Sequence, residues 1–166
     1  MVKLRDSISE ALDSAGYDLL ALIHGSEGLL AVITEITVKL LPLPPARATL
    51  SASFNSMSEA AAMVQQIFAA GFLPSSLEIA DKFTLEAARQ DSGAAHVPSG
   101  NAHLLVDLDG QDQAVDAEMQ KMRDLIQSRK PTGLEIATNE TDCEKLWALR
   151  RQFSNSLRAT GLTKLN

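Results

Sequence analysis

The chain has 166 residues, of which 45% are apolar and 22% charged, and its 15 basic and 21 acidic side chains give a formal net charge of −6. This composition excludes a disordered or low-complexity chain, and the acidic balance argues against nucleic acid as a partner. A single cysteine forms no internal disulfide and the three histidines lack zinc-site spacing, so we expect no metal site and a reducing, cytoplasmic location. We expect neither a signal peptide nor a membrane span, because no apolar run approaches about 18 residues.

A proline-rich segment at residues 41–45 divides the sequence. Its prolines remove backbone donors and impose extended geometry, so we place a domain boundary there. Upstream, residues 17–24 form a short apolar segment and residues 25–28 a tight turn, while the β-branched residues of 29–41 predict one long strand. A lone strand does not fold by itself, so its partner strands must lie outside this segment.

The first half of the remaining sequence predicts strand, helix and strand. Residues 48–54 form the first strand, and Ser56 with Glu59 forms a capping box that starts a helix ending at Gly71. Residues 77–83 predict a second strand, which runs into a helical segment at 85–90.

The second half repeats the pattern. Alternating apolar residues at 102–108 predict a third strand, followed by an amphipathic helix that ends at Pro131 and a fourth strand at 134–138. The order β-α-β-β-α-β predicts an α+β, ferredoxin-like fold, with an antiparallel sheet and two helices on one face. A second capping box, Thr141 to Glu144, predicts a further helix over 142–159.

The two ends of the sequence indicate whether the chain is complete, and two further features, a pair of aspartates and a tryptophan, allow structural predictions. Neither the first residues nor the last three carry the signals of a finished element, so we expect a piece of a longer protein. Asp107 and Asp109 share one strand face, which favours a solvated edge, and Trp147 is expected to be a packing anchor.

The last predicted helix carries an arginine on its apolar stripe. Arg150 lies in the middle of that stripe and Ser154 follows one turn later at its edge. A guanidinium on a buried face needs an anion, which is either a protein carboxylate or a bound acid. The alternative is a surface arginine whose charged head extends into solvent.

The turn at residues 25–28 exposes backbone amides, which a phosphate or the polar edge of a heterocycle would accept. A plain turn is the alternative, because neither dinucleotide-binding nor P-loop spacing is present. Cys143 has no histidine near it in sequence and is read as structural. No residue is assigned a catalytic role.

Several segments resemble a known family. Asp-Leu-Leu at 18–20, Gly-Ser-Glu-Gly-Leu-Leu-Ala-Val-Ile-Thr at 25–34 and Val-Lys-Leu-Leu-Pro-Leu-Pro at 38–44 resemble the last strand of the FAD-binding domain in flavin-linked oxidases of the vanillyl-alcohol oxidase type. Leu-Pro-Ser-Ser-Leu-Glu-Ile-Ala-Asp at 73–81 and Leu-Trp-Ala-Leu-Arg at 146–150 resemble the branch that oxidises D-2-hydroxy acids, namely the D-lactate, glycolate and D-2-hydroxyglutarate dehydrogenases.

This resemblance implies two domains and two sites. Residues 1–45 would be the end of the FAD-binding domain and its linker, and residues 46–166 part of the cap domain that binds substrate. The residues that would lie beside FAD are Gly25, Ser26, Glu27, Gly28, Val32, Ile33 and Thr34. The residues that would hold the carboxylate of a small 2-hydroxy acid are Arg150, Ser154 and Lys164.

The resemblance also implies that a longer parent is an FAD-dependent dehydrogenase producing the 2-oxo acid. The pyrophosphate loop and the histidine motif of the family are absent from the sequence, so the isolated chain is expected to be inactive. The electron acceptor is not indicated. Two alternatives stay open: a free-standing ferredoxin-like module that binds a small acid or a partner chain, even as a homodimer, and an inactive remnant. Leu29 and Ala31, where the family usually has threonine and glycine, keep the second alternative open.

Overall fold

The computed structural model describes residues 17–93 and 97–161. The chain divides into two compact units, Met1–Pro42 and Leu43–Asn166, which are described separately.

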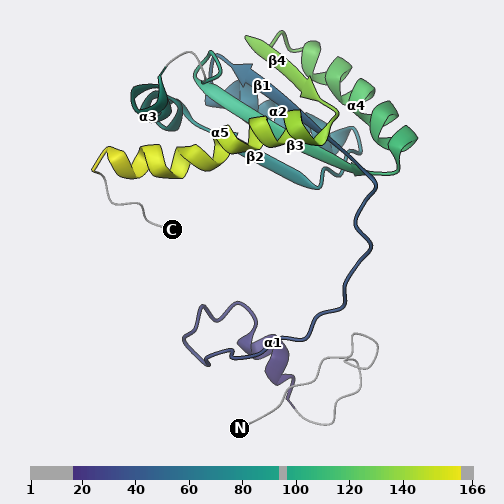
Figure 1. Ribbon diagram of the computed structural model, residues 1–166, viewed down its shortest axis with the longest axis vertical. Coiled ribbons are helices and arrows are strands. Elements are labelled where there is room, and N and C mark those ends of the chain that lie inside the picture. Colours follow the sequence, from purple (N-terminus) through teal and green to yellow (C-terminus); the bar gives the residue numbers. More distant parts are fainter. Residues whose placement is uncertain (1–16, 94–96, 162–166) are drawn as a thin grey trace. The chain divides into compact units, whose positions relative to one another are not determined.

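The second unit is built on one four-stranded antiparallel sheet (Figure 1). Its elements are β1 (Ala46–Phe54), α2 (Met57–Ala69), β2 (Ser76–Ala80), α3 (Lys82–Ser92), β3 (Ala102–Gly110), α4 (Asp112–Gln127), β4 (Gly133–Ala137) and α5 (Glu140–Ala159). The strand order is β2-β3-β1-β4, so the two long strands β3 and β1 occupy the centre. This topology confirms the predicted ferredoxin-like fold.

One face of the sheet forms the main hydrophobic core. Alternate residues of β1, such as Leu50 and Phe54, are fully buried against the apolar stripes of α2 and α4. Met63 of α2 and Met119 of α4 lie in the same cluster. The two helices predicted from their 3.6-residue periodicity therefore cover one face of the sheet, as expected.

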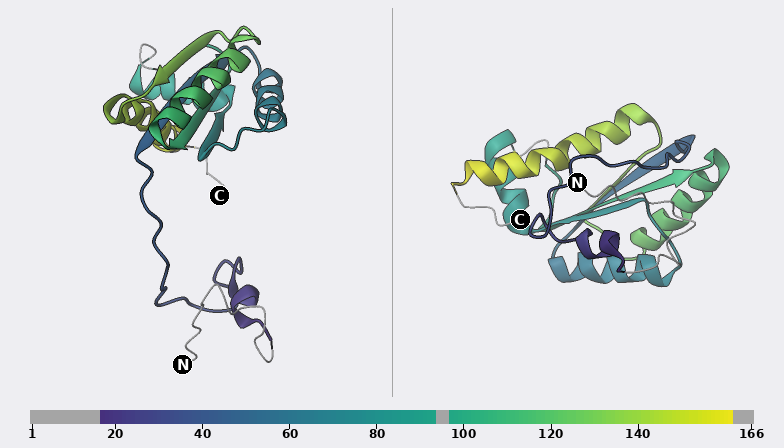
Figure 2. Two further views of the ribbon diagram at one scale, coloured as in Figure 1. Left: turned by 90° about the vertical axis from the view of Figure 1, so that its right-hand side faces the viewer. Right: turned by 90° about the horizontal axis from the view of Figure 1, so that it is seen from below.

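The opposite face carries α5, with α3 packed beside it. The right-hand view of Figure 2 shows the sheet edge-on between α5 and the layer formed by α2 and α4. The intervening residues of the central strands face α5 and are mostly polar, although they are buried: Thr49, Ser51, Ser53, His103 and Asp107. Because a buried polar side chain needs a partner, this face is expected to contain specific hydrogen bonds.

Two helix starts differ from the prediction. Asp81, which was expected inside a strand, caps α3 by accepting a hydrogen bond from the Thr84 amide at 2.9 Å, so β2 ends at Ala80. The predicted capping box that begins at Thr141 is wrong. Asn139 caps α5 instead, accepting from the Asp142 amide at 2.9 Å, and the helix begins two residues earlier than expected.

The first unit contains a short helix, α1 (Leu19–Ile23), where only an apolar segment was predicted. The long strand predicted over residues 29–41 is wrong: this segment has no strand pairing in the structure. Many of its apolar side chains are exposed, including Leu29, Val32 and Leu40. The physical reason is that a β-branched sequence becomes a strand only when a neighbouring strand satisfies its backbone groups, and these residues have none.

No helix in the described parts of the chain is long and apolar enough to cross a membrane.

Candidate functional site

A buried carboxylate joins α5 to the sheet. Asp107 of β3 is 4% exposed and accepts hydrogen bonds from Thr49 Oγ1 at 2.6 Å, Trp147 Nε1 at 2.9 Å and Arg47 Nε at 2.8 Å. Arg47 adds a second contact through Nη2 at 2.6 Å and also lies over the Trp147 ring. Asp107 of β3 thus binds two residues of β1 and one of α5, and these charge-assisted hydrogen bonds fix where the helix lies on the two central strands.

This cluster corrects the expectation for Asp107. A solvated edge was predicted for Asp107 and Asp109 together, but only Asp109 is exposed. The reason is tertiary: alternation places both residues on the face that α5 covers, and Trp147 reaches only Asp107. Trp147 is thus the predicted anchor, with its indole N–H bonded as well as its ring packed.

A second buried pair lies further along the same face. His103 of β3 and Ser51 of β1 share a hydrogen bond of 2.8 Å between Nε2 and Oγ. Phe153 of α5 contacts the imidazole edge-on, with ring centroids 6.3 Å apart. Burial lowers the pKa of His103 to about 4, so the imidazole is neutral at physiological pH.

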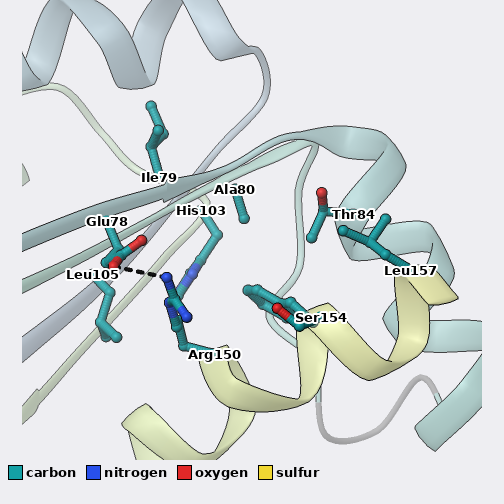
Figure 3. A pocket seen from close by; sticks show the side chains of 10 residues that line it. Glu78, Ile79, Ala80, Thr84, His103, Leu105, Arg150, Ser154 and Leu157 are labelled. Atoms are coloured by element: carbon teal, nitrogen blue, oxygen red, sulfur yellow. Dashed lines mark hydrogen bonds and ion pairs between the residues drawn. The ribbon is translucent and has the colours of Figure 1, made fainter. Parts of the chain in front are cut away.

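Arg150 and Ser154 line one cavity between α5 and the edge of the sheet (Figure 3). Its volume is about 150 Å³, and its ten lining residues are Glu78, Ile79, Ala80, Thr84, His103, Leu105, Arg150, Phe153, Ser154 and Leu157. At roughly 30 Å³ per water molecule, the space admits about five waters, which is enough for the carboxylate end of a small organic acid. Two of these residues are charged, three are polar and five are apolar.

Arg150 has a protein anion beside it. Its Nη2 donates to Glu78 Oε1 at 2.9 Å, and the two side chains are 38% and 37% exposed. Of the two kinds of anion expected for this arginine, the structure shows the protein carboxylate. Figure 3 shows Glu78 reaching the guanidinium from β2, while Ser154 lies one helical turn further along α5.

The remaining residues predicted for the two sites have different outcomes. Lys164 lies outside the described residues. The turn at residues 25–28 is present, with φ of 76° at Gly25 and 80° at Gly28, and a Cβ added at either glycine would meet no protein atom within 4 Å. The space beside both glycines is therefore unfilled by protein atoms. The turn belongs to the first unit and the cavity to the second.

A metal site and a reactive thiol are the two other kinds of site that the residue types would allow. No group of three or more His, Cys, Asp or Glu side chains there is placed to hold a metal ion. Cys143 is buried, and its thiol donates to the Ala137 carbonyl at 3.4 Å, which fits a structural role. The residues that sequence reasoning missed are Glu78 and Asp107, whose partners lie 72 and 40 positions away along the chain.

Comparison with known protein families identifies the family to which the chain belongs. Residues 43–165 match the family model described as FAD linked oxidases, C-terminal domain. The chain belongs to this family. The matched residues span the whole sheet, α5 and the cavity that contains Arg150.

Several curated members of the FAD-linked oxidase family are similar along most of the chain. The glycolate oxidase subunit GlcD of Escherichia coli is 41% identical over 143 residues, covering 86% of this chain and 29% of the relative. GlcD of Bacillus subtilis is 34% identical, covering 89% and 31%. A D-lactate dehydrogenase of Archaeoglobus fulgidus is 34% identical, covering 88% and 32%. The chain therefore spans about a third of the length of these relatives.

A solved structure shares the fold. Alkyldihydroxyacetonephosphate synthase matches with a TM-score of 0.62 at 22% identity, covering 89% of this chain and 31% of that one. At this identity the likeness concerns the fold alone.

Proposed function

We propose that this chain is the segment of an FAD-dependent dehydrogenase that holds the carboxylate of a small D-2-hydroxy acid, such as D-lactate, glycolate or D-2-hydroxyglutarate, for oxidation to the 2-oxo acid. The observation that carries the proposal is the convergence of Arg150 and Ser154, from successive turns of α5, on one small cavity. The relatives named as glycolate oxidase subunits and a D-lactate dehydrogenase support it.

Each residue has a distinct role in this proposal. Arg150 binds the carboxylate, because a planar guanidinium matches the two oxygens of a carboxylate. Ser154 adds a hydroxyl donor one turn later, and Lys164, beyond the described residues, supplies a second positive charge. Together they orient the C2 atom of the substrate. Bound FAD would supply the oxidant for the hydride at C2, and the hydroxyl proton would pass to a base from the longer parent.

The cofactor site of the proposal lies in the first unit. The open turn at Gly25 to Gly28, with Val32, Ile33 and Thr34, would contact FAD, and residues 1–45 would complete the FAD-binding domain of a longer parent. Residues 46–166 would be the part of the cap domain that approaches the substrate. The exposed apolar side chains of the first unit are consistent with partner strands supplied by that parent.

The test is kinetic. In the full-length flavoprotein that contains this segment, oxidation of D-lactate, glycolate and D-2-hydroxyglutarate is followed with an artificial electron acceptor. Arg150→Ala should raise KM by about 10- to 100-fold, since hydrogen bonds to charged groups contribute about 1.5–3 kcal/mol. Arg151→Ala is the matched control, because Arg151 is exposed and pairs with Glu144. Unchanged KM in a folded, FAD-loaded Arg150→Ala protein would refute the assignment.

A free-standing acid-binding module is the second candidate, favoured by the separate hydrophobic core of the unit Leu43–Asn166. It predicts that the 166-residue chain alone binds D-lactate and unfolds cooperatively. A chain that binds D-lactate only within the full-length flavoprotein would exclude the module.

A further inference from the structure

Among the residues that the structure describes, the Arg150 guanidinium makes one side-chain hydrogen bond. It offers five N–H donors in a rigid plane, and Glu78 contacts it through Nη2 alone. Within residues 17–93 and 97–161, Glu78 is the one carboxylate that forms an ion pair with Arg150. Donors on the rest of the plane are therefore left for a ligand in the cavity.

The sheet determines where Glu78 lies. It is the central residue of β2 and pairs directly with Leu105 of β3. Directly paired residues of antiparallel strands project from the same face, and Leu105 lines the cavity. Glu78 is consequently held on the α5 side of the sheet by the pairing of β2 with β3, whereas Arg150 reaches it through a long and flexible side chain.

Building on the proposed function, we propose that Glu78 is a positioning residue for carboxylate binding. By holding one amino group of Arg150, it restricts the arginine before substrate arrives and directs the remaining donors into the cavity. A restricted side chain loses less conformational entropy when the substrate binds, so preorganisation strengthens binding without any contact between Glu78 and the substrate.

The rival role for Glu78 is competition. A carboxylate beside Arg150 would then occupy the position that the substrate carboxylate needs, and its removal would tighten binding. The two roles predict opposite signs for the same substitution, so one series of variants separates them.

The first experiment uses NMR of the 166-residue chain. The heteronuclear NOE of the Arg150 Nε–H group reports motion of the side chain. It should be high in the wild type and in Glu78→Gln, whose amide oxygen accepts the same hydrogen bond, and low in Glu78→Ala. Glu118→Ala, an exposed substitution on α4, is the control. An Arg150 signal that is equally rigid in Glu78→Ala overturns the proposal.

The second experiment measures the consequence for binding. In the full-length flavoprotein, Glu78→Ala should raise the KM for D-lactate about tenfold, and Glu78→Gln should recover most of it, as expected for a hydrogen bond to a charged group. The preference for D-lactate over D-lactamide, which lacks the carboxylate, should fall by a similar factor. If Glu78 only stabilised the fold, its loss would weaken the binding of D-lactate and of D-lactamide by the same factor.

The outcomes distinguish failure of the positioning role of Glu78 from failure of the proposed function. A lower KM in Glu78→Ala, or an unchanged preference over the amide, overturns the positioning role while the proposed function stands. If Arg150→Ala also leaves KM unchanged, the proposed function fails and the NMR result alone decides whether Glu78 orders Arg150. Should Glu78→Ala not fold, Glu78→Thr replaces it, because threonine suits a strand and is too short to reach Arg150.

Discussion

Replacing Asp107 with alanine tests whether the buried carboxylate holds α5 on the sheet. The substitution removes the acceptor of three hydrogen bonds, from Arg47, Thr49 and Trp147. It leaves the backbone of β3 unchanged, because alanine is tolerated in a strand. The loss in the free energy of unfolding then measures what these three hydrogen bonds contribute.

The three donors contribute unequally because their burial differs. Thr49 is fully buried, so its hydroxyl would lose the acceptor that Asp107 provides, at a cost of about 1–3 kcal/mol. Trp147 is half-buried and the Arg47 side chain is 29% exposed, so both regain some hydration. We therefore expect a total loss of about 2–4 kcal/mol, below the 3–5 kcal/mol typical of breaking a fully buried ion pair. Asp107→Asn keeps one acceptor oxygen for Thr49 and Trp147 and should cost about half as much.

Urea unfolding of the 166-residue chain measures the effect, followed by fluorescence of the single tryptophan and independently by far-ultraviolet circular dichroism. Asp109→Ala is the matched control, since Asp109 lies two residues along the same face and is exposed; it should change stability by less than about 0.5 kcal/mol. A loss for Asp107→Ala below about 1 kcal/mol, or equal to that of Asp109→Ala, would show that the cluster does not hold α5.

Two further predictions concern stability. The pKa of His103 is about 4 in the folded state against 6.5 normally, so the folded protein binds fewer protons than the unfolded chain between these values, and stability should fall as pH falls from 6.5 towards 4. At about 1.4 kcal/mol per pKa unit the loss approaches 3 kcal/mol, and the difference between wild type and His103→Gln across this range measures it; parallel curves would contradict the expectation. Gly100 has φ of 96°, and an added Cβ would lie 2.6 Å from the Phe54 carbonyl oxygen, so Gly100→Ala should cost more than about 2 kcal/mol. Gly71→Ala, with φ of 87° at the cap that ends α2 and no atom within 4 Å of an added Cβ, should cost only about 1 kcal/mol, and equal losses in thermal unfolding would show that the close approach at Gly100 is unimportant.

The fold was predictable where the signal is local. The serine half of the capping box at Ser56 is present, with the Glu59 amide donating to Ser56 Oγ at 3.2 Å, whereas the Glu59 carboxylate accepts from the Asn55 amide at 3.1 Å and not from the Ser56 amide. Periodicity located both core helices. The prediction failed over residues 29–41, because strand formation there depends on partners that the segment itself does not contain. It also failed at Asp81 and Asn139, where the cap is a residue that fits more than one local pattern.

The candidate site was also predictable only in part, because its contacts depend on residues far apart in the sequence. The position of Arg150 on an apolar stripe indicated that it needs an anion, but which carboxylate supplies it depends on the pairing of β2 with β3. Asp107 was misread because its face of the sheet is polar, and polar alternation looks the same whether water or a helix covers it. Only the placement of α5 distinguishes the two cases.

That placement links the buried cluster to the cavity. Trp147 and Arg150 are three residues apart on α5, so they lie on one face of the helix, and the bond from Trp147 to Asp107 fixes the rotation that directs Arg150 towards Glu78. Asp107 and Glu78 thus hold the same helix from two strands, one through the tryptophan and one through the arginine itself. If this is correct, Asp107→Ala should weaken the ordering of the Arg150 Nε–H group even while Glu78 is intact. An Arg150 signal that is unaffected by loss of Asp107 would mean that Glu78 alone determines where the guanidinium lies.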